Sequence, residues 1–281
     1  MSYNLYLGDC LEVMKEIPSK SIDMILCDLP YGTTARNKWD IIIPMNDYIN
    51  IDNKNIEKNE FYLNQFLKGL SKEEIDKIWK ENKQEGLWTH YNRIIKDNGA
   101  ILLFSQTPFD KILGYSNLKM LRYEWIWEKT TATGHLNAKK MPMKAHENIL
   151  VFYKKLPVYN PQKTTGHTPV HSYTKYQDDG SNYGKTALGI SGGGSTERYP
   201  RSVQVFKTDK QKCALHPTQK PVDLCEYLVK TYTNEGDLVL DNCMGSGSTG
   251  VACINTNRNF IGIELDENYF KIAKDRIENI K

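Results

Sequence analysis

The sequence CDLPYG follows directly on the apolar run IDMIL, which spans residues 22–26. A short apolar run of this kind predicts a buried strand, so an acid, a proline and an aromatic ring stand where that strand ends. The Asp28 carboxylate can only accept hydrogen bonds. Pro30 fixes its own φ and holds Leu29 in an extended conformation, which orients a main-chain carbonyl in advance. Tyr31 adds a flat face on which a planar ligand could lie.

This combination suits methyl transfer to an exocyclic amine. The lone pair of such an amine is delocalised into its base, and two acceptors directed at the two N–H bonds favour a pyramidal, more nucleophilic nitrogen. Asp28 and the carbonyl held by Leu29 and Pro30 supply two acceptors, and Tyr31 suits stacking of a base that has left the helix. A four-residue pattern is also compatible with a purely structural turn. A second motif, one that could bind a methyl donor, is therefore needed to distinguish a catalytic site from such a turn.

The second site is the glycine-rich segment LVLDNCMGSGSTG, residues 238–250. It runs from a strand pattern into a helical one, and Gly245, Gly247 and Gly250 satisfy the fingerprint of a nucleoside-cofactor site. Glu264, 19 residues after Gly245, is spaced to accept hydrogen bonds from ribose hydroxyls. The fingerprint alone does not separate NAD from S-adenosylmethionine, and a tight turn without a ligand is a further alternative. The loop has no Lys or Arg for a pyrophosphate, which favours the methyl donor.

Short apolar runs alternate with helical patterns along the chain, which predicts an α/β fold with a mostly parallel sheet covered by helices. The run AILLF has no polar alternation, as expected of a strand that is covered on both faces. We expect strands at residues 4–7, 21–27, 99–104, 121–127, 149–153, 237–240 and 259–263. We expect helices within residues 59–96 and at 108–116, 222–233, 248–256 and 268–279.

Two polar segments interrupt this pattern. Residues 44–86 predict a helical insertion, and residues 155–212 predict short strands and loops. Residues 129–220 hold 15 Lys and Arg against 5 Asp and Glu, whereas the remainder holds 22 against 29. A basic segment in an otherwise acidic chain predicts a surface for a polyanion. We expect phosphate contacts from Lys139, Lys140 and Lys144, and readout of guanine edges by Arg198 and Arg201.

The bulk properties are those of a soluble globular protein, with 281 residues, 40% of them hydrophobic and 25% charged. The sequence shows neither a membrane-spanning run nor a signal peptide, so we expect a cytoplasmic protein with no membrane partner. The six cysteines have no ligand-like spacing, and His167 and His171 have no ligand-like partners. We therefore expect reduced thiols and no metal.

Together these motifs resemble those of the amino-methyltransferases of DNA, which methylate adenine at its 6-amino group or cytosine at its 4-amino group. DLPY resembles the family's D/N/S-P-P-Y/F catalytic motif, and residues 241–247 resemble its cofactor loop. FIGIELDENY resembles the ribose-binding segment, HPTQKP the segment around the methionine end of the cofactor, and GDC the strand end near its adenine. The catalytic motif comes first and the cofactor loop last, an order similar to that of the permuted beta group.

The resemblance implies a Rossmann-like S-adenosylmethionine-dependent methyltransferase fold with a mostly parallel seven-stranded sheet. Its catalytic domain would comprise residues 1–154 and 213–281, and residues 155–212 would form an inserted target-recognition region. The catalytic residues that it implies are Asp28, Leu29, Pro30 and Tyr31. The cofactor-binding residues that it implies are Asp9, Cys10, Asp28, His216, Thr218, Lys220, Asp241, Cys243, Gly245, Ser246, Gly247, Thr249, Glu264 and Leu265.

Two positions depart from the family pattern, since Leu29 replaces the first proline and Cys243 stands where an aromatic residue is usual. In this resemblance an Asp at position 28 goes with adenine, so we predict an adenine-specific DNA methyltransferase that flips its target base. Cytosine-N4 activity is the alternative, followed by an RNA methyltransferase, an NAD-dependent dehydrogenase and a non-catalytic DNA-binding protein. The implied partner is double-stranded DNA, and a homodimer and a cognate restriction endonuclease, in a bacterium or its phage, stay open.

Overall fold

A computed structural model of the chain describes residues 2–30, 86–174, 189–208 and 219–280. The chain divides into two compact units, one formed by Met1–Asn160 and Ser202–Lys281 and the other by Pro161–Arg201. None of the helices within the described ranges is long and apolar enough to cross a membrane.

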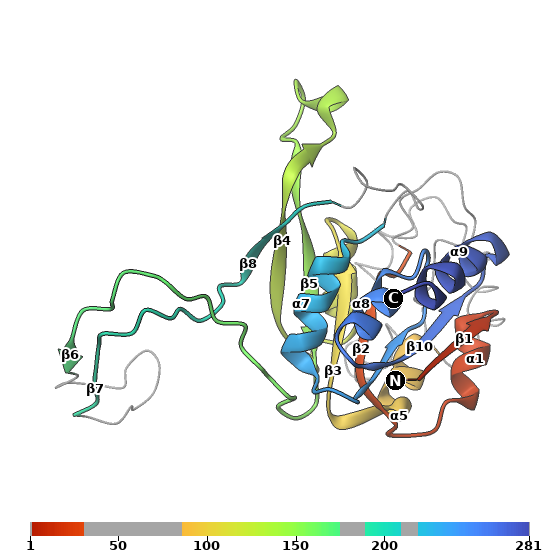
Figure 1. The fold of residues 1–281 in the computed structure, drawn as a ribbon. Coiled ribbons are helices and arrows are strands. Elements are labelled where there is room, and N and C mark those ends of the chain that lie inside the picture. Colours follow the sequence, from red (N-terminus) through yellow and green to blue (C-terminus); the bar gives the residue numbers. More distant parts are fainter. Residues whose placement is uncertain (1, 31–85, 175–188, 209–218, 281) are drawn as a thin grey trace, which may run out of the picture. The chain divides into compact units, whose positions relative to one another are not determined.

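The first unit is built on a sheet whose described strands follow the order β1-β10-β9-β2-β3-β5-β4-β8 (Figure 1). Strands β1, β10, β9, β2 and β3 are parallel, β5 is antiparallel to both β3 and β4, and β8 is parallel to β4. The strands are β1 Tyr3–Leu7, β2 Ile22–Cys27, β3 Ile95–Ser105, β4 Leu121–Thr133, β5 Lys144–Phe152, β8 Val203–Phe206, β9 Leu238–Asp241 and β10 Asn259–Glu264.

The mostly parallel α/β sheet is confirmed, but among the described residues this sheet has eight strands rather than the expected seven. The eighth strand is β8, which comes from the polar segment 155–212 and pairs with β4 at the edge of the sheet. Its residues VQVF are too few to show a period, so only their hydrogen bonds to β4 identify them as part of this sheet.

Helices cover both faces of the sheet (Figure 1). One face carries α1 Cys10–Glu16, α5 Leu87–Ile94 and α6 Phe109–Ser116, and the other carries α7 Val222–Tyr232, α8 Ser248–Asn255 and α9 Glu267–Glu278. Successive side chains of a strand point to opposite faces. In β2, Ile25 and Cys27 therefore pack in the first core and Met24 and Leu26 in the second. This double burial explains why the strand is apolar throughout.

The carboxyl ends of β1, β10, β9 and β2 lie along one edge of the sheet because these strands are parallel. The two strands that carry the sequence motifs are direct neighbours, with Met24 paired to Val239 and Ile25 to Leu240. The next described helix after β2 is α5 on one face, whereas β9 is followed by α8 on the other. Open α/β sheets bind ligands at such a switch point, beyond the carboxyl ends of the strands.

Strands β4 and β5 form a hairpin whose distal part projects beyond the sheet (Figure 1). Thr133 pairs with Lys144 near its end, and His135–Asn137 form a 3-10 turn, η1, at the tip. Every residue from 133 to 146 is exposed. We call residues 129–146 the finger.

The second unit contains a small two-stranded sheet, β6 Tyr173–Thr174 with β7 Ser191–Gly192, and an isolated bridge between Thr164 and Arg198. The target-recognition role of segment 155–212 stays a prediction. The compact unit begins and ends inside that segment, because residues 155–160 and 202–208 belong to the first unit. The expected helical insertion at residues 44–86 lies almost entirely outside the described residues.

Candidate active site

The candidate catalytic acid Asp28 lies immediately after β2, beside the loop that follows β9. Its side chain is 22% exposed, whereas Leu29 is buried in the first core. A buried Leu29 fixes the backbone on the carboxyl side of Asp28, in addition to the restriction imposed by Pro30. Tyr31 lies outside the described residues, so its expected stacking role stays a prediction.

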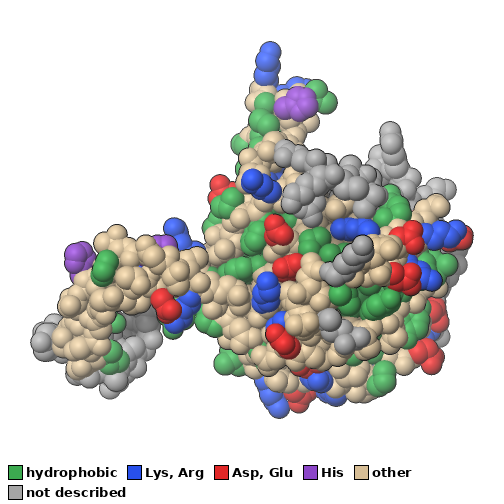
Figure 2. All heavy atoms as spheres, in the orientation of Figure 1, with side chains coloured by type: hydrophobic (Ala, Val, Ile, Leu, Met, Phe, Trp, Pro, Cys, Tyr) green, Lys and Arg blue, Asp and Glu red, His purple; other side chains and the backbone are tan. Residues whose placement is uncertain are grey.

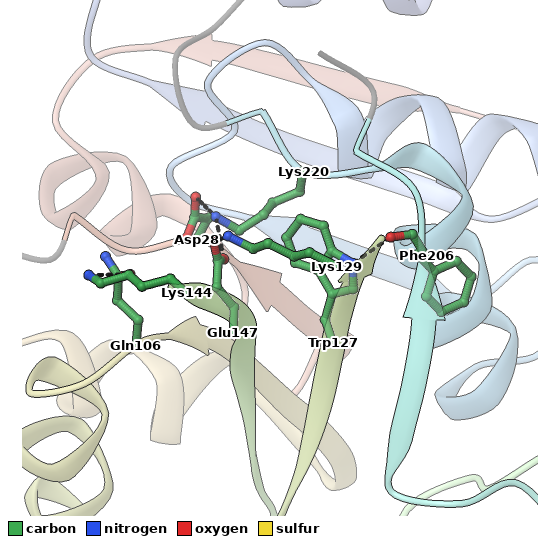
Figure 3. A network of polar contacts seen from close by, with 8 residues as sticks. All are labelled: Asp28, Gln106, Trp127, Lys129, Lys144, Glu147, Phe206 and Lys220. Atoms are coloured by element: carbon green, nitrogen blue, oxygen red, sulfur yellow. Dashed lines mark hydrogen bonds and ion pairs between the residues drawn. The ribbon is translucent and has the colours of Figure 1, made fainter. Parts of the chain in front are cut away.

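Asp28 belongs to a largely buried cluster of four charged side chains (Figure 3). Lys220 Nζ lies 2.5 Å from Asp28 Oδ2 and 3.3 Å from Glu147 Oε2. Lys129 Nζ lies 2.6 Å from the other oxygen of Glu147. The ring of Phe104 lies beneath the Lys220 ammonium, with its centroid 5.2 Å from Nζ. The cluster therefore joins β2, β4, β5 and the segment that leads into α7 through two lysines and two carboxylates.

The charges of this cluster stabilise one another. Burial raises the pKa of Glu147, but Lys220 and Lys129 lower it by more, so its pKa lies below the ordinary value. Burial lowers the pKa of Lys220, but Asp28 and Glu147 raise it by more, so its pKa lies above the ordinary value. The Lys220 side chain is only 8% exposed, and a buried ammonium of this kind requires its carboxylate partners.

The glycine loop has the geometry that a cofactor cradle requires. Gly247 has φ of 79°, a conformation that side chains disfavour, and a Cβ there would lie 3.0 Å from the Cβ of Ala273. At Gly250 a Cβ would lie 2.4 Å from Ile277 Cδ1, so this glycine allows α8 to pack against α9. Ser246 and Thr249 are buried beside these glycines. Tyr91 of α5 holds the loop by donating a 2.5 Å hydrogen bond to Asn242 Oδ1.

The candidate ribose acid Glu264 is tied to the same loop. Its Oε2 accepts a 2.8 Å hydrogen bond from the Gly245 amide, and its Oε1 accepts one of 2.9 Å from the Asp266 amide. Burial raises the pKa of Glu264, although both amides act in the opposite direction. Each carboxylate oxygen has a second lone pair, so the side chain can hold the loop and still accept from a ligand. The neighbouring Leu265 is 54% exposed.

Asp241, at the end of β9, is the most perturbed carboxyl group of the site. Burial raises its pKa to about 7, although the Thr249 hydroxyl and the Cys243 amide lower it. The negative charge of Asp28 adds to the increase. A carboxyl group that titrates near neutrality can bind a ligand either as a proton donor or as an anion.

The strand end GDC lies beside the loop, because the Cys10 thiol hydrogen-bonds to Cys243, and its expected place near the adenine of the cofactor stays a prediction. Asp9 also has a structural role that the sequence did not reveal. Its Oδ1 accepts a 2.8 Å hydrogen bond from the Leu11 amide and so caps α1, a helix that was not predicted. The Cys10 and Cys27 thiols both hydrogen-bond to Cys243. Cys243 thus packs among thiols, where the family pattern has an aromatic ring.

The structure separates the expected DNA-contacting residues into the two units. Lys139, Lys140 and Lys144 all lie on the finger, and Lys144, which pairs with Thr133, donates a 3.4 Å hydrogen bond to Gln106. In the second unit the Arg198 guanidinium donates to the carbonyls of Ser195, Glu197 and Thr168. Arg201 is exposed in the same unit.

Glu147 and Lys129 are the two residues of the site that sequence reasoning did not identify. Glu147 lies within β5 and immediately precedes its buried run NILVF, and an acid next to an apolar run was the only signal that could have drawn attention to it. Lys129 appeared only in the count of basic charge. Their pairing depends on the register between β4 and β5, which is a tertiary property.

The residues present fit a nucleoside-containing cofactor. In addition to the glycine cradle, the buried Ser248 Oγ and Gln219 Oε1 have no hydrogen-bond partner in the described part of the chain. Such atoms normally have partners, so a polar ligand or water is expected to satisfy them. Thr218 and His216 lie outside the described residues. Among the described residues no group of three or more His, Cys, Asp or Glu could hold a metal ion.

Comparison with known proteins agrees with this geometry. A family model described as DNA methylase (N6_N4_Mtase) matches residues 22–275. The type II methyltransferase M2.MboI of Moraxella bovis is 25% identical over 99% of this chain and 89% of its own length. The DNA adenine methyltransferase YhdJ of Escherichia coli K12 is 27% identical over 96% of this chain and 81% of its own length.

Solved structures share the fold. The complex of M1.HpyAVI with SAM superimposes with a TM-score of 0.57 at 20% identity, covering 99% of this chain and 100% of that protein. The cytosine-N4-specific PvuII DNA methyltransferase superimposes with a TM-score of 0.61 at 16% identity, covering 100% of this chain and 89% of that protein. The Rossmann-like architecture is therefore that of known DNA methyltransferases.

Proposed function

The chain belongs to the N6/N4 DNA methylase family, and on that premise we propose that it methylates the exocyclic 6-amino group of adenine in duplex DNA. Its methyl donor is S-adenosyl-L-methionine, held by the glycine loop and Glu264. The observation that carries the proposal is the pairing of β2 with β9, because it places Asp28 directly beside the cofactor loop.

The bound donor supplies an electrophilic methyl group on a sulfonium. The chain's own residues prepare the nucleophile. Two acceptors receive hydrogen bonds from the two N–H groups of the target amine and so localise its lone pair. They are the Asp28 carboxylate and a main-chain carbonyl held by Leu29 and Pro30. Transfer of the methyl group to this nitrogen would leave the donor as a neutral thioether, and the proton that the nitrogen then loses would pass to water. Lys220 and the buried Leu29 keep the Asp28 carboxylate in place before the amine arrives.

Adenine is proposed rather than cytosine because the motif begins with Asp28, and because YhdJ is named an adenine methyltransferase. The cytosine-N4-specific PvuII enzyme shares the fold, so the fold by itself does not choose the base. We expect Tyr31 to stack on the extruded adenine, and the second unit, Pro161–Arg201, to recognise sequence.

Several relatives are named type II methyltransferases, which supports a restriction endonuclease as a cognate partner of this protein. The sequence leaves a homodimer open, and a cytoplasmic location remains a prediction from sequence.

Expression in a host without DNA methylation tests the proposal. Hydrolysed host DNA should contain N6-methyladenine, and sequencing of methylated positions should give one recognition sequence. Asp28→Ala should fold, because Lys220 keeps Glu147 as a partner, and should bind cofactor and DNA but transfer no methyl group. N4-methylcytosine, or full activity of Asp28→Ala, would contradict it.

A further inference from the structure

The tip of the finger exposes apolar side chains on an ordered turn. Leu136 is 87% exposed, Met141 54% and Met143 40%. The turn is folded, since the Asn137 amide donates to the Gly134 carbonyl at 3.0 Å and the Lys140 amide to the Asn137 carbonyl at 2.8 Å. Turns are usually built from polar residues and glycine. A cluster of exposed apolar side chains on an ordered turn indicates a surface that meets a partner.

The charge of the finger shows what kind of partner fits. Residues 129–146 contain Lys129, Lys139, Lys140 and Lys144 and no Asp or Glu. On the face shown in Figure 2, the projecting tip bears Lys, His and apolar side chains and no acidic ones. A partner that binds both the lysines and the apolar side chains of the finger has an anionic exterior and an apolar interior. Duplex DNA meets this description, with phosphates outside and stacked bases inside.

The base of the finger belongs to the catalytic cluster. Lys129, where the finger begins, pairs with Glu147, which directly follows it, and Glu147 also pairs with Lys220 beside Asp28 (Figure 3). A duplex whose target base enters the site at Asp28 therefore extends toward the finger. This continuity favours DNA over a membrane or another protein as the partner of the tip.

We propose that the finger is a wedge that enters the duplex beside the target base, and that Leu136 fills the space this base leaves. The inference rests on the proposed function, since it requires a base to leave the helix. Apolar side chains inserted between base steps stabilise an unstacked duplex. Lys139 and Lys140 would hold the flanking phosphates, which positions the wedge without reading sequence.

The test uses the full chain, S-adenosylmethionine and a duplex that carries the recognition sequence found by methylation sequencing. Leu136→Ala should lower kcat/KM on the paired duplex by at least about tenfold, mainly through kcat, because base extrusion loses its stabilisation. Leu136→Met should keep most of the activity. The matched control is Leu118→Ala, which removes another exposed leucine, 54% exposed, outside the finger, and it should behave as wild type.

A second substrate distinguishes insertion of Leu136 into the duplex from a purely structural role of this side chain in the protein. On a duplex in which the target base faces a mismatch, extrusion is easier, so Leu136→Ala should recover to within about twofold of wild type. Paired-duplex activity of Leu136→Ala within about twofold of wild type would overturn the wedge, as would an equal loss on both duplexes. If the wild-type protein methylates no DNA, both the proposed function and the wedge are wrong. If only binding to anionic lipid vesicles depends on Leu136, the tip is a membrane contact and the wedge is wrong.

Discussion

Replacement of Lys220 by methionine tests whether the buried charge cluster organises Asp28. Methionine preserves most of the aliphatic stem but leaves two carboxylates, Asp28 and Glu147, without the lysine they share. All three side chains are less than a quarter exposed. Removing one partner from a buried ion pair costs about 3–5 kcal/mol, because the remaining charge stays desolvated. For a domain of this size such a loss lowers Tm by on the order of 10 °C.

Thermal unfolding of the cofactor-free protein would measure this loss. Lys271→Met is the matched control, because Lys271 forms a 2.8 Å pair with Glu267 whose members are 65% and 67% exposed, and surface pairs contribute little. Adding Asp28→Asn to Lys220→Met should recover part of the lost stability, since it removes a carboxylate that has lost its lysine. Lys220→Met should also reduce kcat more than cofactor affinity. A Tm equal to wild type, or strictly additive effects in the double variant, would refute the reasoning.

The other predictions concern the remaining carboxyl groups of the site. Because the pKa of Glu147 lies below its ordinary value of 4.5, its contribution to stability is present above that pH and is lost as the pH falls further. Glu147→Gln should therefore lower Tm at pH 7, and the difference should vanish in melts recorded well below pH 4.5. Asp241, whose pKa is raised from 3.8 to about 7, opposes folding increasingly between those two values, so Asp241→Asn should raise the apo Tm at pH 8 but not at pH 3.8. Glu264→Gln should weaken S-adenosylmethionine binding by about 1–3 kcal/mol in calorimetry, because it disturbs both the loop amides and the ribose contact; unchanged affinity would remove Glu264 from the cofactor site.

Local sequence patterns predicted the elements of the sheet well. All seven expected strands occur, and five helices begin and end within a few residues of their expected limits or lie inside them. The helix α1 was missed because its seven residues, CLEVMKE, are too short for a clear period, and Asp9 was interpreted only as a ligand contact. Strand β8 lies in the segment where short strands and loops were expected, but its four residues carry no pattern that could predict its limits or its place in the main sheet.

The chemistry of Asp28 and of the glycine loop could be predicted because each motif is a few neighbouring residues whose backbone and donor set are encoded locally. The order of the strands is not encoded locally. The 2.5 Å contact between Lys220 and Asp28 joins residues 192 apart, and it forms because β2, β5 and the start of α7 meet at one edge of the sheet. The role of Glu147 likewise depends on the register of β5 against β4, which is set by the packing of both faces of the sheet. The sequence by itself therefore determined which residues could do chemistry, and only the tertiary structure decided which charges hold them in place.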